Sequence, residues 1–243
     1  MRIAALQARG PDRDLVRIAA AATTAADRGA DVLVVPELFV GGYDPAAFPG
    51  PDETLLPRLQ DLAARQGVAL VAAEPEGDPP AITAVVLAGD GTVSGRYRKT
   101  HLYGPAERAA FVPGDGDRFV VAIGGLRCGV AVCYDVEFPE VVRGLALAGA
   151  EVVLVPTALD DPAVSRVLVP ARAMENRVGL AYADHVGPGF CGGSVIAGPD
   201  GRARARAGAV ADAVLVADVT RDDLDRARAG ADYLADRRPE TYR

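Results

Sequence analysis

Cys133 stands at the end of an apolar run, Leu126–Val132, that has the composition of a buried strand. Pro139 and Glu140 follow shortly afterwards and suit the first turn of a helix. A strand that ends in a cysteine and then turns toward a helix exposes the sulfur at the edge of a sheet. The same turn directs the backbone N–H of Tyr134 toward the place where an oxyanion would form. Cys133 is therefore a candidate nucleophile.

Burial as a small hydrophobic residue is the alternative role for a free cysteine, and we favour it for Cys128 and Cys191. The three cysteines are an odd number without a C-x-x-C pair, so they predict neither a disulfide framework nor a structural zinc site. Only two histidines are present, which makes a histidine-rich metal site hard to assemble. We expect a mechanism with no metal and no cofactor.

A thiol nucleophile needs a base to take its proton and a cation to hold developing charge. Glu37 follows the apolar run Asp31–Val35 and Pro36, at the carboxyl end where open α/β sheets place their sites. Lys99 lies in the segment Tyr97–Leu102, where cations end another expected strand. Taken singly, the acid would suit a surface or capping position and the cations a solvated sheet edge. Taken together, they supply the base and the cation.

The three segments occur in the order Pro-Glu-Leu, Arg-Lys-Thr-His-Leu-Tyr-Gly and Cys-Tyr-Asp-x-x-Phe-Pro-Glu. This order resembles the nitrilase superfamily of carbon–nitrogen hydrolases, and in particular its amidase-like branch. The opening residues Arg2–Gln7 and the later Ala171–Asn176 also resemble that family, so the match spans nearly the whole chain. The resemblance implies an α/β fold that is a four-layer αββα sandwich, with two mixed β-sheets inside and helices outside.

The resemblance also implies a Glu-Lys-Cys triad, which falls on Glu37, Lys99 and Cys133. A second family glutamate, eight residues after the lysine, falls on Glu107 and would position substrate or share protons. In this scheme Glu37 takes the thiol proton, returns it to the leaving amine and then activates water. Lys99 and the Tyr134 amide would form the oxyanion hole.

The periodicity along the chain predicts strands joined by crossover helices, with hairpins added. Helices are expected at 15–28, 53–66, 141–148 and 164–177. Strands are expected at 2–8, 31–35, 68–73, 82–87, 92–97, 119–123, 126–132, 152–155, 180–183, 194–197 and 213–217. Strands outnumber the helices between them, which favours two facing sheets over one doubly wound sheet. We expect a single domain over residues 1–243.

Composition narrows the class of partner. The formal net charge is −7, and the basic residues are spread along the chain, which argues against binding to a nucleic-acid backbone. The sequence shows neither a secretory signal nor about 20 consecutive apolar residues, so we expect a cytoplasmic protein without membrane association. The expected partners are a small amide substrate and water.

Acidic residues near the expected mouth of the site bear on substrate choice. Glu137 stands four positions after Cys133, where many relatives that accept carboxylate-bearing substrates have a basic residue. Asp160 and Asp161 follow an expected strand, although they would equally suit solvent exposure or a helix cap. An acidic mouth repels carboxylates. We therefore predict a neutral or cationic carboxamide.

Further substrate contacts are assigned to Thr157 and Ala158, in the loop before Asp160, and to Tyr43. Glu137 completes this set. An N-carbamoyl amine hydrolase and a nitrilase remain alternative activities, and an inactive binding or assembly module with the same fold is a third alternative.

A Cys-His hydrolase that uses His101 or His185 is a further alternative. His101 lies two residues from Lys99 in an expected strand, so the two side chains are predicted to face the same way. The C-terminal stretch, residues 230–243, resembles the tail by which related amidases contact a neighbouring subunit. That resemblance implies a homodimer or a higher homo-oligomer, whereas a tail folded against its own chain is the alternative.

Overall fold

Two six-stranded sheets and a short two-stranded one form from residues 1–13, 15–231 and 233–242, the residues that this computed structural model describes. The first sheet has the order β14-β1-β2-β3-β4-β5, with β1 (Arg2–Gln7), β2 (Val32–Val34), β3 (Ala69–Glu76), β4 (Ala81–Leu87), β5 (Val93–Arg98) and β14 (Ala213–Asp218). Its pairs β1-β2 and β2-β3 are parallel and the others antiparallel. This sheet is therefore mixed.

The second sheet has the order β13-β12-β9-β8-β7-β6. Its strands are β6 (Val120–Ile123), β7 (Leu126–Val130), β8 (Val152–Pro156), β9 (Gly179–Ala183), β12 (Val195–Ala197) and β13 (Ala203–Arg206). Only β7-β8 and β8-β9 are parallel among its described pairs, so this sheet is mixed as well. The small sheet pairs β10 (Val186–Gly187) with β11 (Phe190–Cys191).

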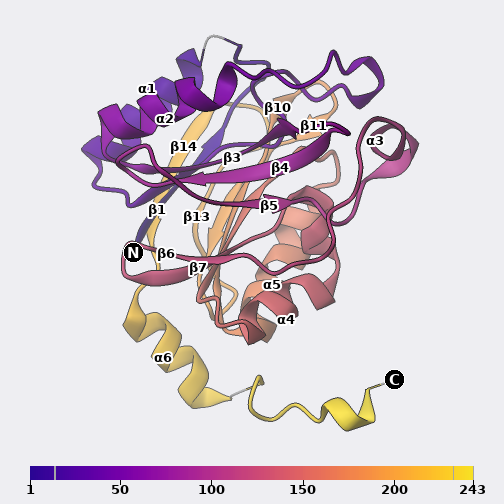
Figure 1. Cartoon of the computed structure of the whole chain (residues 1–243). Helices are drawn as coiled ribbons and strands as arrows, with labels where there is room; N and C mark the ends of the chain where they lie inside the picture. The colour runs from indigo at the N-terminus through magenta and orange to yellow at the C-terminus, as the bar shows by residue number, and fades with distance from the viewer. Residues whose placement is uncertain (14, 232, 243) are drawn as a thin grey trace.

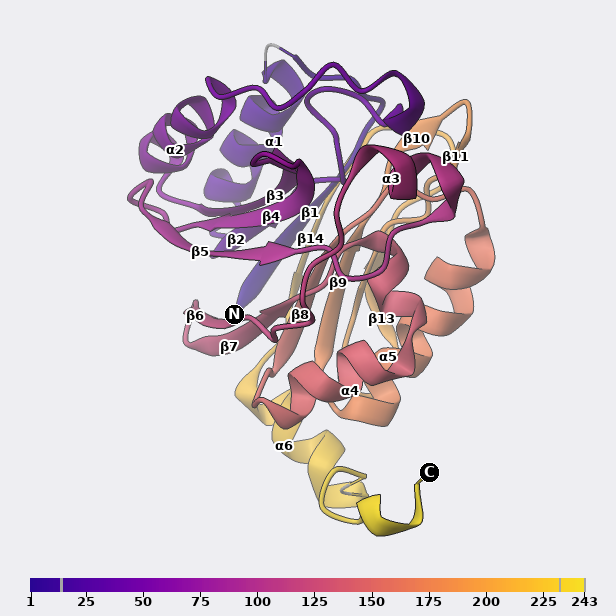
Figure 2. The same cartoon turned by 45° about the vertical axis from the view of Figure 1, so that its right-hand side comes forward.

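Helices cover the outer face of each sheet (Figures 1 and 2). The α-helices are α1 (Val16–Asp27), α2 (Leu55–Gln66), α3 (Gly104–Ala110), α4 (Pro139–Leu147), α5 (Val169–Asn176) and α6 (Arg221–Gly230). The helices α1 and α2 lie over the first sheet, and α4 and α5 over the second. The fold is thus the αββα sandwich that the sequence predicted.

Helix α1 shows how the outer layer packs. Its buried residues are Ile18, Ala21, Ala22 and Ala25, which are spaced so that they share one face of the helix. The small alanine side chains let the helix approach the sheet closely. The same spacing principle applies to α2, where leucines occupy the buried face.

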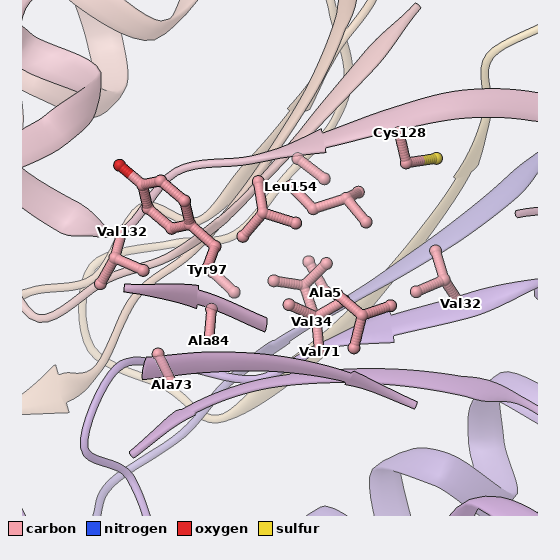
Figure 3. Close-up of a cluster of buried hydrophobic side chains, with 14 of the residues drawn as sticks. Ala5, Val32, Val34, Val71, Ala73, Ala84, Tyr97, Cys128, Val132 and Leu154 are labelled. Atoms are coloured by element: carbon pink, nitrogen blue, oxygen red, sulfur yellow. The ribbon is translucent and has the colours of Figure 1, made fainter. Parts of the chain in front are cut away.

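The main core lies between the two sheets. Val34 and Val71 from the first sheet meet Leu154 and Cys128 from the second in one buried cluster, part of which is drawn in Figure 3. Central strands of this kind are buried on both faces, which explains why they read as continuous apolar runs rather than as alternating patterns. Cys128 is fully buried here, as the sequence indicated.

One predicted helix begins differently in the structure, and one helix near the C-terminus was not predicted. The expected helix 164–177 begins instead as one π-helical turn, η3 (Val164–Leu168), and continues as α5. Pro170 at the start of α5 lacks the N–H that a regular helix would use there, which accounts for the wider turn. Helix α6 was not predicted, although Thr220 and Asp223 form a reciprocal capping box at its start.

The segment after α6 extends away from the two sheets (Figures 1 and 2). Arg177 places its guanidinium 4.4 Å from the ring centroid of Tyr233. A single 3₁₀ turn, η4 (Pro239–Thr241), lies near the C-terminus. The predicted tail 230–243 also includes Asp232 and Arg243, which lie outside the described residues. None of the described helices has the length and apolar composition needed to cross a membrane.

Candidate active site

Glu37 is held in place by contacts with the second sheet. It follows β2 by three residues, and its backbone N–H donates to the carbonyl of Thr157 over 3.1 Å. Its own carbonyl accepts a 2.6 Å hydrogen bond from His185 Nε2. The next residue, Leu38, has a φ of 49°, in the left-handed region that side chains rarely adopt. The Glu37 side chain is fully buried.

Lys99 follows β5 directly and is also fully buried. Its backbone N–H donates to the carbonyl of Ile82 over 2.8 Å, so the sheet pairing fixes its position. Its Nζ donates to Glu37 Oε1 at 2.7 Å and to both carboxylate oxygens of Glu107, at 2.9 and 2.8 Å. Lys99 therefore joins the two acids.

Glu107 reaches this cluster from α3, a short helix with a proline in its first turn. Its Oε1 accepts a 2.6 Å hydrogen bond from the hydroxyl of Tyr43. Its Oε2 accepts a 2.8 Å hydrogen bond from the backbone N–H of Tyr103. The carboxylate is thus anchored by donors in addition to Lys99. Helix α3 itself was not predicted, because its seven residues are too few for a clear periodic pattern.

Cys133 occupies the sharp turn that the sequence indicated. It is the first residue of the 3₁₀ helix η2 (Cys133–Glu137), and its φ is 49°. Its Sγ lies 3.6 Å from the carbonyl oxygen of Ala158, and the residue is 2% exposed. The first backbone hydrogen bond of the turn runs from Asp135 N–H to the Val132 carbonyl. The N–H of Tyr134 precedes that bond, so it has no acceptor within the helix.

Asp135 connects the cysteine turn to the segment around Lys99. Its Oδ2 accepts hydrogen bonds from the Val132 N–H at 3.1 Å and the Tyr97 hydroxyl at 2.8 Å. Its Oδ1 accepts from the backbone N–H of His101 at 2.9 Å and lies 2.8 Å from His101 Nδ1. Sequence reasoning missed this buried aspartate, although it stands two residues after the candidate nucleophile.

His101 differs from its prediction. Strand β5 ends at Arg98, so Lys99 and His101 do not share a strand face. The His101 ring pairs with Asp135 and stacks on Phe138, with ring centroids 3.9 Å apart. Lys99 instead points to the two glutamates. The two side chains therefore diverge, because the strand ends at Arg98 and a bend follows at Thr100 and His101.

Burial sets the protonation chemistry of the cluster. It raises the pKa of Glu37 to about 7, an effect that the Lys99 charge opposes and the Glu107 charge adds to. Burial lowers the pKa of Lys99, but the neighbouring negative charges outweigh it and hold that pKa above its ordinary value. Burial, with the charge of Glu37, raises the pKa of Cys133 well above that of a free thiol. At rest the cysteine is therefore a thiol, and it needs a base.

Glu37 Oε2 is buried and has no hydrogen-bond partner among the described residues. The Cys133 thiol nevertheless lies near enough to lower the pKa of Glu37. Oε1 is engaged by Lys99, so Oε2 is the oxygen left to accept a proton. The arrangement can thus transfer a proton from sulfur to carboxylate.

A cavity of about 300 Å³ adjoins the cluster. Its lining residues are Tyr43, Tyr103, Ala158, Leu159, Asp160, Pro188, Gly189 and Phe190. Tyr43 also contacts Glu107, and the Ala158 carbonyl contacts Cys133, so two of the lining residues touch the cluster directly. The cavity has room for a small organic amide.

The other predicted substrate contacts lie off this lining, within the described part of the chain. Thr157 is fully buried; its hydroxyl donates to the Val155 carbonyl, and its own carbonyl accepts from the Glu37 N–H. Glu137 is half-buried, and its carbonyl accepts from Arg172. Burial and the charge of Asp161 raise the pKa of Glu137, which places those two acids near one another.

No group of three His, Cys, Asp or Glu side chains in residues 1–13, 15–231 and 233–242 is arranged to hold a metal ion. His185 does not fit the Cys-His alternative, in which its imidazole would have to take the proton of Cys133. Its Nε2 bonds the Glu37 backbone, and its ring packs against Phe39 and Phe190.

Comparisons with known proteins identify a family model and several relatives that this chain resembles. Residues 2–229 match the family model for carbon–nitrogen hydrolases. An (R)-stereoselective amidase from Pseudomonas sp. is 38% identical, over 98% of this chain and 92% of that protein. An N-carbamoylputrescine amidase from Solanum lycopersicum is 34% identical, over 89% of this chain and 84% of that protein.

Solved structures of an amidase from Nesterenkonia sp. AN1 are similar throughout. One mutant, which shows Michael addition of acrylamide at the active-site cysteine, is 43% identical with a TM-score of 0.89 and covers 99% of this chain and 97% of that one. Another mutant, in complex with butyramide, has the same identity and TM-score and covers 99% of this chain and 95% of that one. The similarity confirms the predicted fold.

Proposed function

The chain belongs to the carbon–nitrogen hydrolase family, and from this membership we propose that it hydrolyses a small carboxamide through a thioester on Cys133, releasing ammonia. The observation that carries the proposal is the buried cluster in which Lys99 joins Glu37 to Glu107 beside the Cys133 thiol. The Nesterenkonia amidase, with its active-site cysteine, supports the same assignment.

The first step is activation of the thiol. Glu37 Oε2 takes the proton from Cys133 Sγ, and the sulfur attacks the amide carbonyl carbon to form a C–S bond. The carbonyl π electrons move to oxygen, which becomes an oxyanion. A raised thiol pKa makes this base necessary, because little thiolate is present before the proton is transferred.

The oxyanion is stabilised by the Tyr134 N–H and by Lys99. The Tyr134 N–H has no acceptor within its helix, so it is available to the substrate. Lys99 Nζ has three N–H bonds and contacts three carboxylate oxygens. When one N–H of Lys99 is bifurcated between the two oxygens of Glu107 and a second bonds Glu37, the third N–H is free to reach the oxyanion. One such donor typically contributes about 3 kcal/mol to the transition state.

Collapse of the oxyanion breaks the C–N bond. The proton held by Glu37 goes to the leaving nitrogen, and ammonia departs. Glu37 then takes a proton from water, which attacks the thioester carbon. The C–S bond breaks, the carboxylic acid leaves, and the proton returns to sulfur, so the enzyme is regenerated without a metal or cofactor.

We propose a neutral or cationic amide as the substrate. Tyr43, Tyr103 and Phe190 give the cavity aromatic walls, and Asp160 lies at its lining. The charge of Asp160, followed by burial and the charge of Glu137, raises the pKa of Tyr103, so both carboxylates are close enough to act on this ring electrostatically. Such a mouth disfavours a substrate carboxylate.

An N-carbamoyl amine is the second candidate substrate. The N-carbamoylputrescine amidases among the relatives support it, and an amine cation suits the acidic mouth. A nitrile has no comparable support from the residues of the cavity.

The test is ammonia release from a panel of amides, carbamoyl amines and nitriles. We expect wild type to turn over at least one amide, with butyramide as the first to try because a mutant of the Nesterenkonia amidase binds it. We expect C133A to turn over none, while C128A keeps its activity because the Cys128 thiol contacts Met1 and is not part of the site. A panel member carrying a carboxylate should be poorer than its neutral or cationic analogue. Turnover by C133A would contradict the thioester, and a preference for carboxylates would contradict the charge argument.

We also propose that the chain is one domain that forms a homodimer through residues 230–243, and that it acts in the cytoplasm. Tyr233 and Tyr242 are exposed aromatic residues of that tail, at 43% and 59%. Light scattering on the full chain and on a chain ending at Gly230 tests the assembly. A dimer that persists without the tail would contradict its role.

A further inference from the structure

His185 lies behind the proposed base and holds its backbone. Its Nε2 is 2.6 Å from the carbonyl oxygen of Glu37, which is a short contact for a nitrogen donor. A carbonyl oxygen only accepts hydrogen bonds, so Nε2 carries the proton and His185 is the donor. Both groups are buried, which makes the loss of the donor costly for the carbonyl.

The peptide that His185 holds is a strained one. Leu38 follows Glu37 with a φ of 49°, a conformation that residues with a β carbon rarely adopt. The Leu38 N–H donates to the Ala73 carbonyl over 2.8 Å, which anchors the far side of this peptide. Without a donor on its carbonyl, the peptide between Glu37 and Leu38 gains freedom to rotate toward a relaxed conformation. That rotation would carry the Glu37 side chain with it.

The bond also crosses between the two sheets. Glu37 follows a strand of the first sheet, whereas His185, Thr157 and Cys133 all follow strands of the second. The Glu37 N–H donates to Thr157 and its carbonyl accepts from His185. These two bonds therefore fix the base relative to the element that carries the nucleophile.

The imidazole is itself firmly placed. Its ring centroid lies 4.6 Å from that of Phe190 and 5.2 Å from that of Phe39. Its backbone N–H donates to Asp184 Oδ1 over 2.8 Å. A β carbon at Gly10 would lie 3.1 Å from its Cε1, so the ring has little room to swing. Burial lowers the pKa of His185 to about 4, which keeps the ring neutral near pH 7.

We infer that His185 is a positioning residue that sets the Glu37 carboxylate against the Cys133 thiol by holding the Glu37 carbonyl. This inference rests on the proposed function, in which Glu37 is the base. It assigns His185 no contact with substrate and no proton transfer.

Three substitutions separate the hydrogen bond from the ring. In His185→Gln the side-chain nitrogen is as many bonds from the backbone as Nε2, so the donor is kept and the ring is lost. In His185→Asn the amide nitrogen is one bond shorter and does not reach. In His185→Phe the ring stays stacked between Phe39 and Phe190 while the donor is lost.

The readouts are butyramide turnover and the pH profile of Cys133 alkylation by iodoacetamide. We expect kcat to fall roughly 10- to 100-fold in the Phe and Asn variants, with little change in KM, and to recover largely in the Gln variant. In wild type, the pH profile of the alkylation rate should contain a step that is due to the ionisation of Glu37. The Phe variant should lack that step. A general loosening of the fold would instead speed alkylation at every pH.

A double-mutant cycle with Glu37→Gln completes the test. If His185 acts through Glu37, adding H185F to E37Q should change the alkylation rate by less than twofold. Three results would overturn the inference: additive losses of alkylation rate in the double mutant, wild-type activity in H185F, or an H185Q variant as impaired as H185F. A wild-type alkylation profile in E37Q would instead overturn the proposed function, which keeps the two failures distinct.

Discussion

Lys99 Nζ lies 2.7 Å from Glu37 Oε1, and both side chains are fully buried. Glu37 follows β2 and Lys99 follows β5, and two strands separate these in the sheet. A buried ion pair is costly to assemble and more costly to break, because a partner left alone is an unpaired buried charge. The pair therefore shapes both the reactivity and the stability of the protein.

Replacing Lys99 by Met should remove activity and destabilise the fold. Glu37 and Glu107 would be left close together without a cation. We expect a loss of roughly 3–5 kcal/mol in the free energy of unfolding at neutral pH, measured by urea denaturation. The loss should shrink at lower pH, where protonation of Glu37 removes one of the uncompensated charges. A variant with unchanged stability and turnover would contradict the role of this cation.

The activity should depend on the ionisation of Glu37. Burial raises the pKa of Glu37 to about 7, and only its carboxylate form accepts the thiol proton. We expect kcat/KM for butyramide to rise with pH through an apparent pKa near 7 and to level off above it. The cluster titrates as a unit, so the midpoint belongs to the whole cluster. A profile flat from about pH 5 to about pH 8 would argue against this base.

Glu74 should make stability fall as pH rises. Burial raises its pKa to about 8, although backbone N–H groups of Phe39, Val40 and Gly41 oppose the shift. An acid with a raised folded pKa contributes its stability fully below its unfolded value, about 4.3, and loses it as pH rises through the folded value.

Glu74→Gln should therefore flatten the dependence of unfolding free energy on pH. The wild type should lose on the order of a few kcal/mol more than E74Q between about pH 5 and about pH 9. Chemical denaturation at several pH values measures this difference. Parallel curves for the two proteins would show that Glu74 is not protonated in the folded state.

Asp135 should matter for turnover more than for substrate affinity. Its carboxylate joins the Cys133 turn to the Lys99 segment through Val132, Tyr97 and His101. We expect Asp135→Ala to lower kcat by roughly 100-fold with a smaller effect on KM, because the reacting groups shift relative to each other. Equal effects on kcat and KM, or none, would speak against this link.

His101→Ala should cost less activity than Glu37→Gln. His101 contacts Asp135 and Phe138 and takes no part in the proton transfers. Ammonia release from both variants at equal concentrations of folded protein tests this order. The reverse order would favour a Cys-His mechanism.

Strand ends were the features that sequence could locate. Glu37 and Cys133 each follow an apolar run, Lys99 follows another expected strand, and the spacing of the three motifs identified the family. The two-sheet architecture also followed from the excess of strands over helices. These signals lie in short segments, so they can be detected in a single sequence.

The residues that hold the catalytic groups in place have no signal in the local sequence. His185 and Glu37 are 148 positions apart, and Asp135 and Tyr97 are 38 apart, so only the fold brings them together. The ring of His101 turns away from Lys99 because β5 ends at Arg98, so neither residue lies in the strand whose alternation was expected to align them. Thr157 proved to bond Glu37 through its carbonyl, which side-chain chemistry could not indicate.

The most direct test of the thioester is intact-protein mass spectrometry after acid quench of the protein with butyramide, followed by peptide mapping. We predict an adduct of the acyl group's mass on Cys133 that hydroxylamine removes and that C133A lacks. An adduct on Cys128 or Cys191, or turnover in the C133A protein, would contradict it.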